Sequence, residues 1–132
     1  MGAIKIFVDS YLAGADLSAK QFYAVELTAA NTVNVCSAAA DRAVGILQNT
    51  PRANEAAAIC HSGRTYARAD GASVAIAVGD LVGPAAGGKL IKKTTADFST
   101  LGTALTAAAA DDLIIEVLLG APGGGVFTAP AG

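Results

Sequence analysis

Apolar and polar residues alternate in short runs along most of this chain, and a two-residue period is typical of β-strands with one buried face. The first run, residues 4–8, has the sequence IKIFV, and the last, residues 113–119, has the sequence LIIEVLL. Between them, turns of small and polar residues separate further runs at 22–27, 32–36, 43–48, 56–61, 64–68, 81–82, 89–92 and 101–105. Strands spaced in this way predict a sandwich or a small barrel rather than alternating strands and helices.

Two alanine-rich segments are the main evidence against an all-β fold, because alanine is the best helix former. Residues 37–41 and 106–112 are both shorter than eight residues, and neither has an apolar stripe of helical period. Helices this short are marginal on their own. Both segments are therefore predicted to be turns.

The chain also resembles itself at an offset of 57 residues. Without a gap, this offset places Gly14 on Gly71, Gly45 on Gly102, Asn54-Glu55 on Asp111-Asp112, and Gly63 on Gly120. The order of strands and turns repeats with it. We therefore predict an all-β fold, a small sandwich or barrel built from two similar halves at about 14–63 and 71–120.

The two ends are predicted to be flexible arms on a single β domain at 14–119. Residues 1–13 form an N-terminal arm or strand, since the alternation at 4–8 suits the extension of a neighbour's sheet. Residues 120–132 are rich in Gly and Pro and are expected to stay flexible unless a partner orders them. Val126 and Phe127 are the large apolar residues of this tail.

Composition and charge limit the kinds of molecule that this protein is expected to bind. The hydrophobic fraction is 53%, but no apolar run approaches the roughly 20 residues of a membrane-spanning helix, and the N-terminus lacks the features of a signal peptide. We expect a soluble protein made in a cytoplasm, with no membrane partner. The net charge is −2 and the cations are scattered apart from Lys89, Lys92 and Lys93, so a nucleic-acid partner is not expected.

One segment nearly matches a phosphate-binding loop. Gly83, Gly88 and Lys89 fit the pattern G-x-x-x-x-G-K-[ST], but Leu90 stands where Ser or Thr would hold magnesium. The residues that follow are β-like, whereas the loop requires a helix that begins at the phosphates. Gly87-Gly88 is a strong hairpin signal, so the segment is predicted to be a turn between strands.

No other group of residues predicts catalysis. Cys36 and Cys60 lack the spacing of a metal site and are expected to be small buried hydrophobes, with a disulfide between them less favoured. His61 is the one histidine, placed at the end of a strand before a Ser62-Gly63 turn and expected to be exposed. Adjacent strand residues point to opposite faces, so Cys60 and His61 are not expected to pair. We predict no catalytic residues, no metal and no cofactor.

The strand and turn phrases themselves resemble those of tailed-bacteriophage capsid decoration proteins, also called cement proteins. The phrases are "RAVGILQNTPRANEAAAICHSG", "VAVGDLVGPAAGGKLIKKTTAD" and "LGTALTAAAADDLIIEVLL", and the resemblance runs from about Ala15 to Leu119. It implies a small all-β protein without catalytic residues or cofactor. It also implies binding to the outside of an icosahedral head, usually as a symmetric oligomer.

These observations predict a structural, non-enzymatic decoration protein on the capsid exterior of a virion. It would bind the major capsid protein, clamp adjacent capsid subunits and associate with itself, as a homotrimer. The residues expected to contact the capsid come from the two ends: Ile4, Ile6, Phe7, Val8, Tyr11, Val126 and Phe127.

Two alternatives stay open. The first is a β-barrel adhesin or ligand-binding module on a virion surface, against which stands the scarcity of aromatic residues, at 5%. The second, ranked below it, is an enzyme centred on His61. The decoration hypothesis predicts that replacing His61 by Ala changes nothing measurable.

Overall fold

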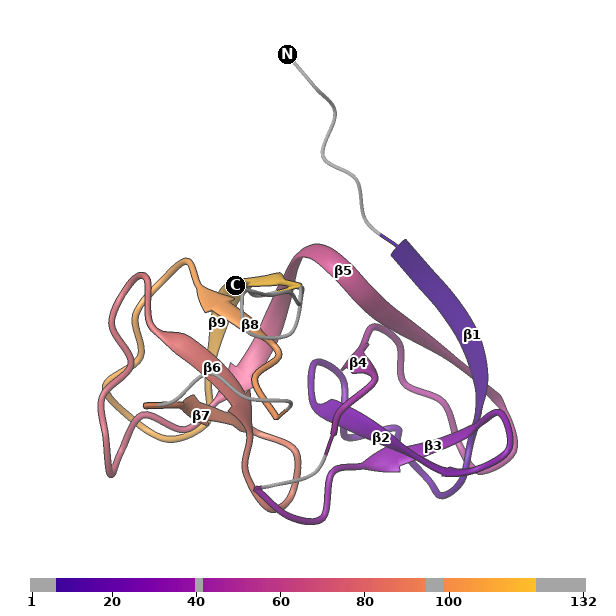
Figure 1. The fold of residues 1–132 in the computed structure, drawn as a ribbon. Coiled ribbons are helices and arrows are strands. Elements are labelled where there is room, and N and C mark those ends of the chain that lie inside the picture. Colours follow the sequence, from indigo (N-terminus) through magenta and orange to yellow (C-terminus); the bar gives the residue numbers. More distant parts are fainter. Residues whose placement is uncertain (1–6, 40–41, 95–98, 121–132) are drawn as a thin grey trace.

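The computed structural model describes residues 7–39, 42–94 and 99–120. These residues form nine β-strands and no helix (Figure 1). The strands are β1 (Phe7–Ala13), β2 (Ala24–Ala29), β3 (Thr32–Val35), β4 (Gly45–Leu47), β5 (Ala56–Ala69), β6 (Leu81–Pro84), β7 (Leu90–Lys92), β8 (Gly102–Ala104) and β9 (Leu113–Leu119). The predicted all-β class is confirmed, and in the described parts the two alanine-rich segments form no helix.

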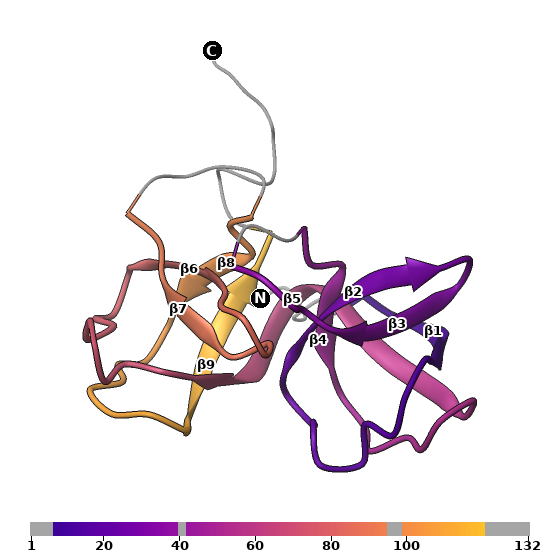
Figure 2. The ribbon, with the colours of Figure 1, turned by 90° about the horizontal axis from the view of Figure 1, so that it is seen from below.

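The nine strands close into two five-stranded rings that share β5. The first ring has the order β1-β3-β2-β4-β5 and closes through β1–β5 pairing. The second has the order β5-β7-β6-β8-β9 and closes through β5–β9 pairing. Figure 2 shows the two rings side by side. The fold is therefore a pair of small barrels, as expected for two similar halves.

Each barrel surrounds its own core, and one core extends between them. The first barrel packs mainly Val25, Val33, Leu47, Ala57 and Ile59. The second core combines residues of the second barrel with four buried residues of the first, which are Ala24, Cys36, Ile46 and Cys60. The barrels are thus joined by packed apolar side chains as well as by a strand.

The strand pairing of the first barrel recurs in the second. Val25 pairs with Val35 in the β2–β3 hairpin, and Val82 pairs with Lys92 in β6–β7, 57 residues further on. The β2–β4 pairs recur at the same offset in β6–β8. The connections repeat too: the backbone hydrogen bond from Phe22 N to Leu47 O corresponds to that from Gly79 N to Ala104 O.

The offset of 57 holds for the three central strands but not at the two ends of the repeat. The pair Ala13↔Val33 recurs as Ala69↔Leu90, so β1 matches β5 at an offset of 56. Positive φ recurs at Asn54 and Asp112, at an offset of 58. The gap-free alignment of residues 54–55 with 111–112 is therefore displaced by one residue. One strand of the closing pair is thus shifted by one residue less than 57, and the other by one residue more. In an antiparallel pair these two shifts cancel, so equivalent residues of the two barrels still stand opposite each other.

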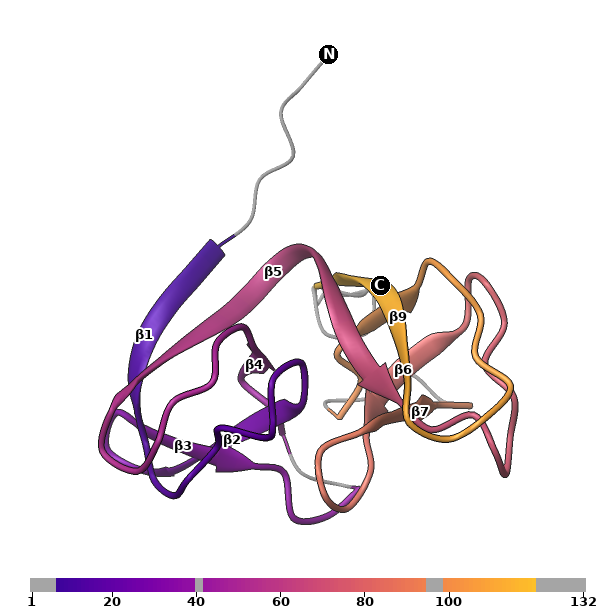
Figure 3. The ribbon, with the colours of Figure 1, turned by 180° about the vertical axis from the view of Figure 1, so that it is seen from behind.

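β5 differs most from the sequence prediction. Residues 56–61 and 64–68 were expected to be two strands around a Ser62-Gly63 turn, but they form one strand of 14 residues. Gly63 lies within it at φ 97°, and the register on β1 shifts between Phe7 and Val8. Phe7 pairs with Ser62 and Val8 with Cys60, so the register shift marks a bulge at His61, close to Gly63. β5 arches from one barrel to the other (Figure 3).

The described part of the predicted N-terminal arm or strand is a strand. β1 begins at Phe7 and pairs with β5 from Phe7 to Leu12, and Ala13 is fully buried. Residues 7–13 therefore form a barrel strand, which is the strand alternative of the expectation for 1–13. Residues 1–6 and 121–132, which make up about half of the predicted N-terminal arm and nearly all of the predicted C-terminal tail, lie outside the described residues.

Candidate functional site

The expected capsid contacts lie partly on β1. Phe7, Val8 and Tyr11 belong to this strand, whereas Ile4, Ile6, Val126 and Phe127 lie outside the described residues. Val8 is 51% exposed and is available to a partner. Tyr11 is half-buried and packs against the core of the first barrel, so its ring is largely used within the chain.

Tyr11 belongs to a small polar cluster with His61 and Asp9. The Tyr11 hydroxyl lies 2.9 Å from His61 Nε2, and the two rings meet edge to face at 5.6 Å. Asp9 Oδ2 lies 3.5 Å from the same nitrogen. Burial, followed by the charge of Asp9, raises the pKa of the Tyr11 hydroxyl, which keeps it protonated as a donor.

The second ring nitrogen settles the role of His61. Nδ1 lies 2.9 Å from the Val44 carbonyl oxygen, which only accepts, so Nδ1 carries a proton. Nε2, the other ring nitrogen, is the partner of the Tyr11 hydroxyl. His61 is half-buried inside β5 rather than exposed at a strand end, because the expected turn is absent. It therefore holds β1, β4 and β5 together, and its replacement by Ala is not expected to be silent.

The two cysteines are buried and not joined in a disulfide, as expected. Cys60 Sγ donates to Ser62 O at 3.3 Å. Burial raises the pKa of the Cys60 thiol, which lowers its thiolate fraction and its reactivity. Its side chain packs in the core that extends between the barrels, away from His61, so no cysteine–histidine pair forms.

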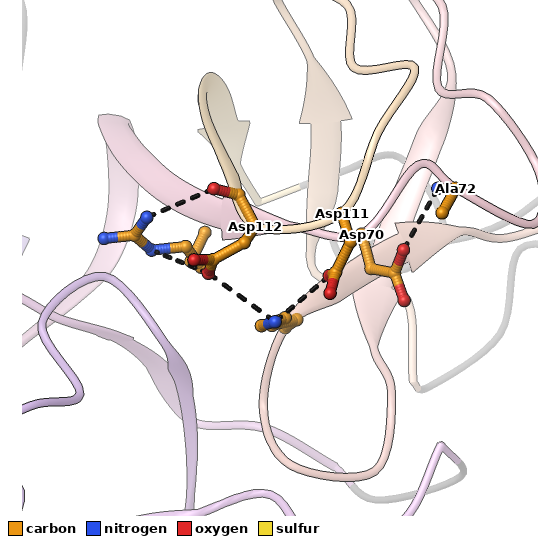
Figure 4. A network of polar contacts seen from close by, with 6 residues as sticks. Asp70, Ala72, Asp111 and Asp112 are labelled. Atoms are coloured by element: carbon orange, nitrogen blue, oxygen red, sulfur yellow. Dashed lines mark hydrogen bonds and ion pairs between the residues drawn. The ribbon is translucent and has the colours of Figure 1, made fainter.

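The near-match to a phosphate loop is a hairpin turn between β6 and β7. Gly87 and Gly88 both have positive φ, at 94° and 91°, and the strand β7 begins at Leu90. Lys89 Nζ lies 3.0 Å from Asp111 Oδ1 and 3.5 Å from Asp112 Oδ1 (Figure 4). The lysine is bound to carboxylates of its own chain, and the predicted turn is confirmed.

The same network ties β5 to the segment before β9. Arg68 Nη1 donates to the Asp112 carbonyl oxygen at 3.2 Å, and Arg68 Nε lies 3.6 Å from Asp112 Oδ1. The hydrogen bond from Lys89 to Asp111 is the main cause of a raised Lys89 pKa. The network thus closes one end of the second barrel with charges that neutralise one another.

A shallow hollow of about 360 Å³ lies beside this network, lined by Lys20, Tyr23, Asp70, Gly87, Lys89 and Asp111, among others. Its lysine and aspartate at positions 89 and 111 are already paired with each other. In the part of the chain that the structure describes, no group of His, Cys, Asp or Glu residues could hold a metal ion. No helix of that part is long and apolar enough to cross a membrane.

A group of exposed apolar side chains of the second barrel lies on β5 and β9. We call it the outer ribbon. On this face Arg64, Tyr66 and Arg68 stand opposite Leu118, Glu116 and Ile114, respectively. Tyr66, Ile114 and Leu118 are 53%, 46% and 47% exposed. Between them, Arg64 Nη2 lies 2.8 Å from Glu116 Oε1.

This surface was not predicted from the sequence, although a signal for it is present there. Residues 113–119 are apolar at nearly every position, more than a strand with one solvated face needs. Ile115, Val117 and Leu119 fill the core, so Ile114 and Leu118 are surplus to it. Such an excess indicates a second buried face or a contact surface.

Comparison with known proteins finds similarity among solved structures. No family model matches the chain, and no curated protein matches it. Among solved structures, the chain resembles "The crystal structure of head fiber gp8.5 N base in bacteriophage phi29", with a TM-score of 0.63 and 10% sequence identity. The match covers 87% of this chain and 94% of that one, so the two share a fold along nearly their whole length.

Proposed function

We propose that this chain is a structural protein of a phage head, a decoration protein that binds the outer surface of the shell. In this role it contacts the major capsid protein, stabilises the contacts between adjacent capsid subunits and associates with itself as a homotrimer. It is made in the host cytoplasm and resides on the capsid exterior, and it has no enzymatic activity.

The observation that carries this proposal is the fold shared with the head fibre base of bacteriophage phi29. The similarity spans both chains nearly completely, so it concerns the whole barrel pair and not one common supersecondary unit. The phrases resembling decoration proteins cover the same region, from about Ala15 to Leu119. Both lines of support lead to a protein attached to a phage head.

The described residues also suit an adhesive rather than a chemical role. His61 is engaged with Tyr11 and the Val44 carbonyl, and Lys89 is engaged with Asp111. Large apolar side chains are instead exposed on strands, on both β1 and β9. Rigid strands lose little conformational entropy when they bind, which favours such surfaces as interfaces.

Cosedimentation with undecorated, expanded heads tests the proposal. The purified protein is expected to pellet with the heads at a saturable ratio and to raise the temperature at which they lose their genome. A protein that stays in the supernatant over a wide concentration range would overturn the proposal. A glycan array run on the same sample tests the adhesin alternative.

A second candidate function follows from the same neighbour, which is the base of a head fibre. A chain of this fold can anchor a longer projection instead of covering the shell. Electron microscopy of heads that carry this protein separates the two, because decoration leaves compact knobs and a fibre base leaves projecting filaments.

A further inference from the structure

The two barrels provide an internal control for the outer ribbon. The corresponding face of the first barrel is formed by β1 and β5, where Val8, Ser10 and Leu12 stand opposite Cys60, Ala58 and Ala56. On its β5 side this face has only small side chains, whereas β9 has Ile114, Glu116 and Leu118. Both barrels close through the same ladder register. The large residues of β9 are therefore not required to close a barrel.

Tyr66 is held in place at the centre of the outer ribbon. Its ring meets the Phe22 ring edge to face, with centroids 5.8 Å apart, and Phe22 precedes β2 of the first barrel. The ribbon is thus continuous with the packing between the two barrels. A half-exposed tyrosine that is already oriented loses little freedom on binding, and tyrosine and arginine are enriched at the centres of protein interfaces.

The charges of the outer ribbon identify its occupant. Arg64 lies 2.8 Å from Glu116, and Arg68 lies 3.6 Å from Asp112 at the end of the ribbon, so each arginine is paired with a carboxylate and the patch has no strong net charge. A strongly charged partner gains little from such a surface. A second copy of the same patch, turned about a symmetry axis, places its glutamate near the arginine of the first.

We propose that copies of this chain associate through the outer ribbon (Arg64, Tyr66, Arg68, Ile114, Glu116 and Leu118), ribbon to ribbon around a symmetry axis. Arg64 of one copy faces Glu116 of the next, and Tyr66, Ile114 and Leu118 bury their exposed surface between copies. The proposal rests on the self-association that forms part of the proposed function, and it locates the interface.

Solution mass tests the interface on the purified chain, without phage heads. The chain mass is 13.0 kDa, and light scattering at about 50 µM is expected to give a small multiple of it, about three for the trimer. The variant Arg64→Glu places two carboxylates on each patch and is expected to weaken association at least tenfold. The double variant Arg64→Glu with Glu116→Arg restores opposite charges and is expected to restore the mass.

The matched control lies on the first barrel. The double variant Val8→Ser with Leu12→Ser removes apolar surface of similar exposure from the equivalent face and is expected to keep the oligomer. Tyr66→Ser with Leu118→Ser is expected to give a monomer. Circular dichroism checks the fold of each variant, and if the apolar pair unfolds, the charge variants on exposed positions decide the matter.

Two outcomes overturn the proposal: a monomeric wild-type chain, or an oligomer that Arg64→Glu leaves intact. Neither outcome bears on head binding, because a monomer that cosediments with heads leaves the proposed attachment standing. Loss of head binding with an intact oligomer leaves the interface standing and overturns the proposed function instead.

Discussion

Two equivalent glycines show how tightly single residues are constrained in this fold. A Cβ atom on Gly45 would lie 2.2 Å from the Cys60 carbonyl oxygen, and one on Gly102 would lie 2.2 Å from the Leu118 carbonyl oxygen. The short strand β4 in the first barrel therefore lies close to the backbone of β5, and β8 in the second barrel lies close to the backbone of β9. The glycine match found at an offset of 57 residues has this physical cause.

At the residue scale we predict that Gly45→Ala destabilises the protein by about 3 kcal/mol, the upper part of the range for overpacking, because the added methyl meets backbone that cannot rotate away. Urea denaturation followed by circular dichroism measures the change. Gly14→Ala is the control, since its nearest contact would be a Thr32 methyl at 3.1 Å and it should cost clearly less. Equal losses for the two variants would contradict the argument.

At the scale of elements, β1 and the Lys89 hairpin show what pairing adds to local pattern. β1 is a strand because β5 and β3 accept it on two sides, not because its own alternation is unusually strong. The β6–β7 hairpin was predictable from Gly87-Gly88. Its attachment through Lys89 to Asp111 was not, because the two residues are brought together only by closure of the barrel.

We predict that removing residues 1–12 unfolds the first barrel, because nearly all of β1 is lost and the core at Leu17, Val33 and Ile59 is opened to water. Removing residues 1–6 should leave the fold intact. Heteronuclear NMR spectra of the two truncated chains distinguish these results. A well-dispersed spectrum for the larger deletion would show that β1 is an accessory strand.

The Lys89 pairs give a pH dependence with a definite sign. The folded-state pKa lies above the ordinary value of 10.5, so the contribution is complete below the unfolded value and disappears as the pH rises through the folded one. Lys89→Met should reduce stability by about 1 kcal/mol or less at pH 8, and the difference from wild type should shrink as the pH rises past the ordinary value of 10.5 and through the folded-state pKa. A difference that stays constant over this rise in pH would exclude the ion pairs as its cause.

At the scale of the whole molecule, the two barrels depend on each other. β5 supplies the closing strand of the first barrel and the opening strand of the second. Ile46 and Cys60 of the first barrel are buried in the core of the second. Duplication here has produced one folding unit with two similar parts rather than two independent domains.

We predict a single cooperative unfolding transition for the chain, because neither barrel can lose its strands without exposing the core that they share. Scanning calorimetry should give equal calorimetric and van't Hoff enthalpies, at low concentration where association does not contribute. An enthalpy ratio near two, or separate transitions by two probes, would mean that the barrels unfold independently.

Most of the strands, most of the turns between them and the two-part plan follow from the sequence alone. These are local properties: a two-residue period, small residues at turns and glycines at repeated positions. The sequence was sufficient to identify the hairpin at Gly87-Gly88 and the burial of Cys36 and Cys60. It also predicted correctly that the side chains of Cys60 and His61 do not pair.

Which segments pair and which faces of the strands stay exposed could be learned only from the three-dimensional structure. Gly63 looks like a turn residue in isolation, but partners on both halves of β5 hold it within one strand, beside a bulge. His61 became half-buried for the same reason, and Ile114 and Leu118 became surface residues because the core was filled by their neighbours. Pairing is set by contacts between residues far apart in the chain, which a local period does not contain.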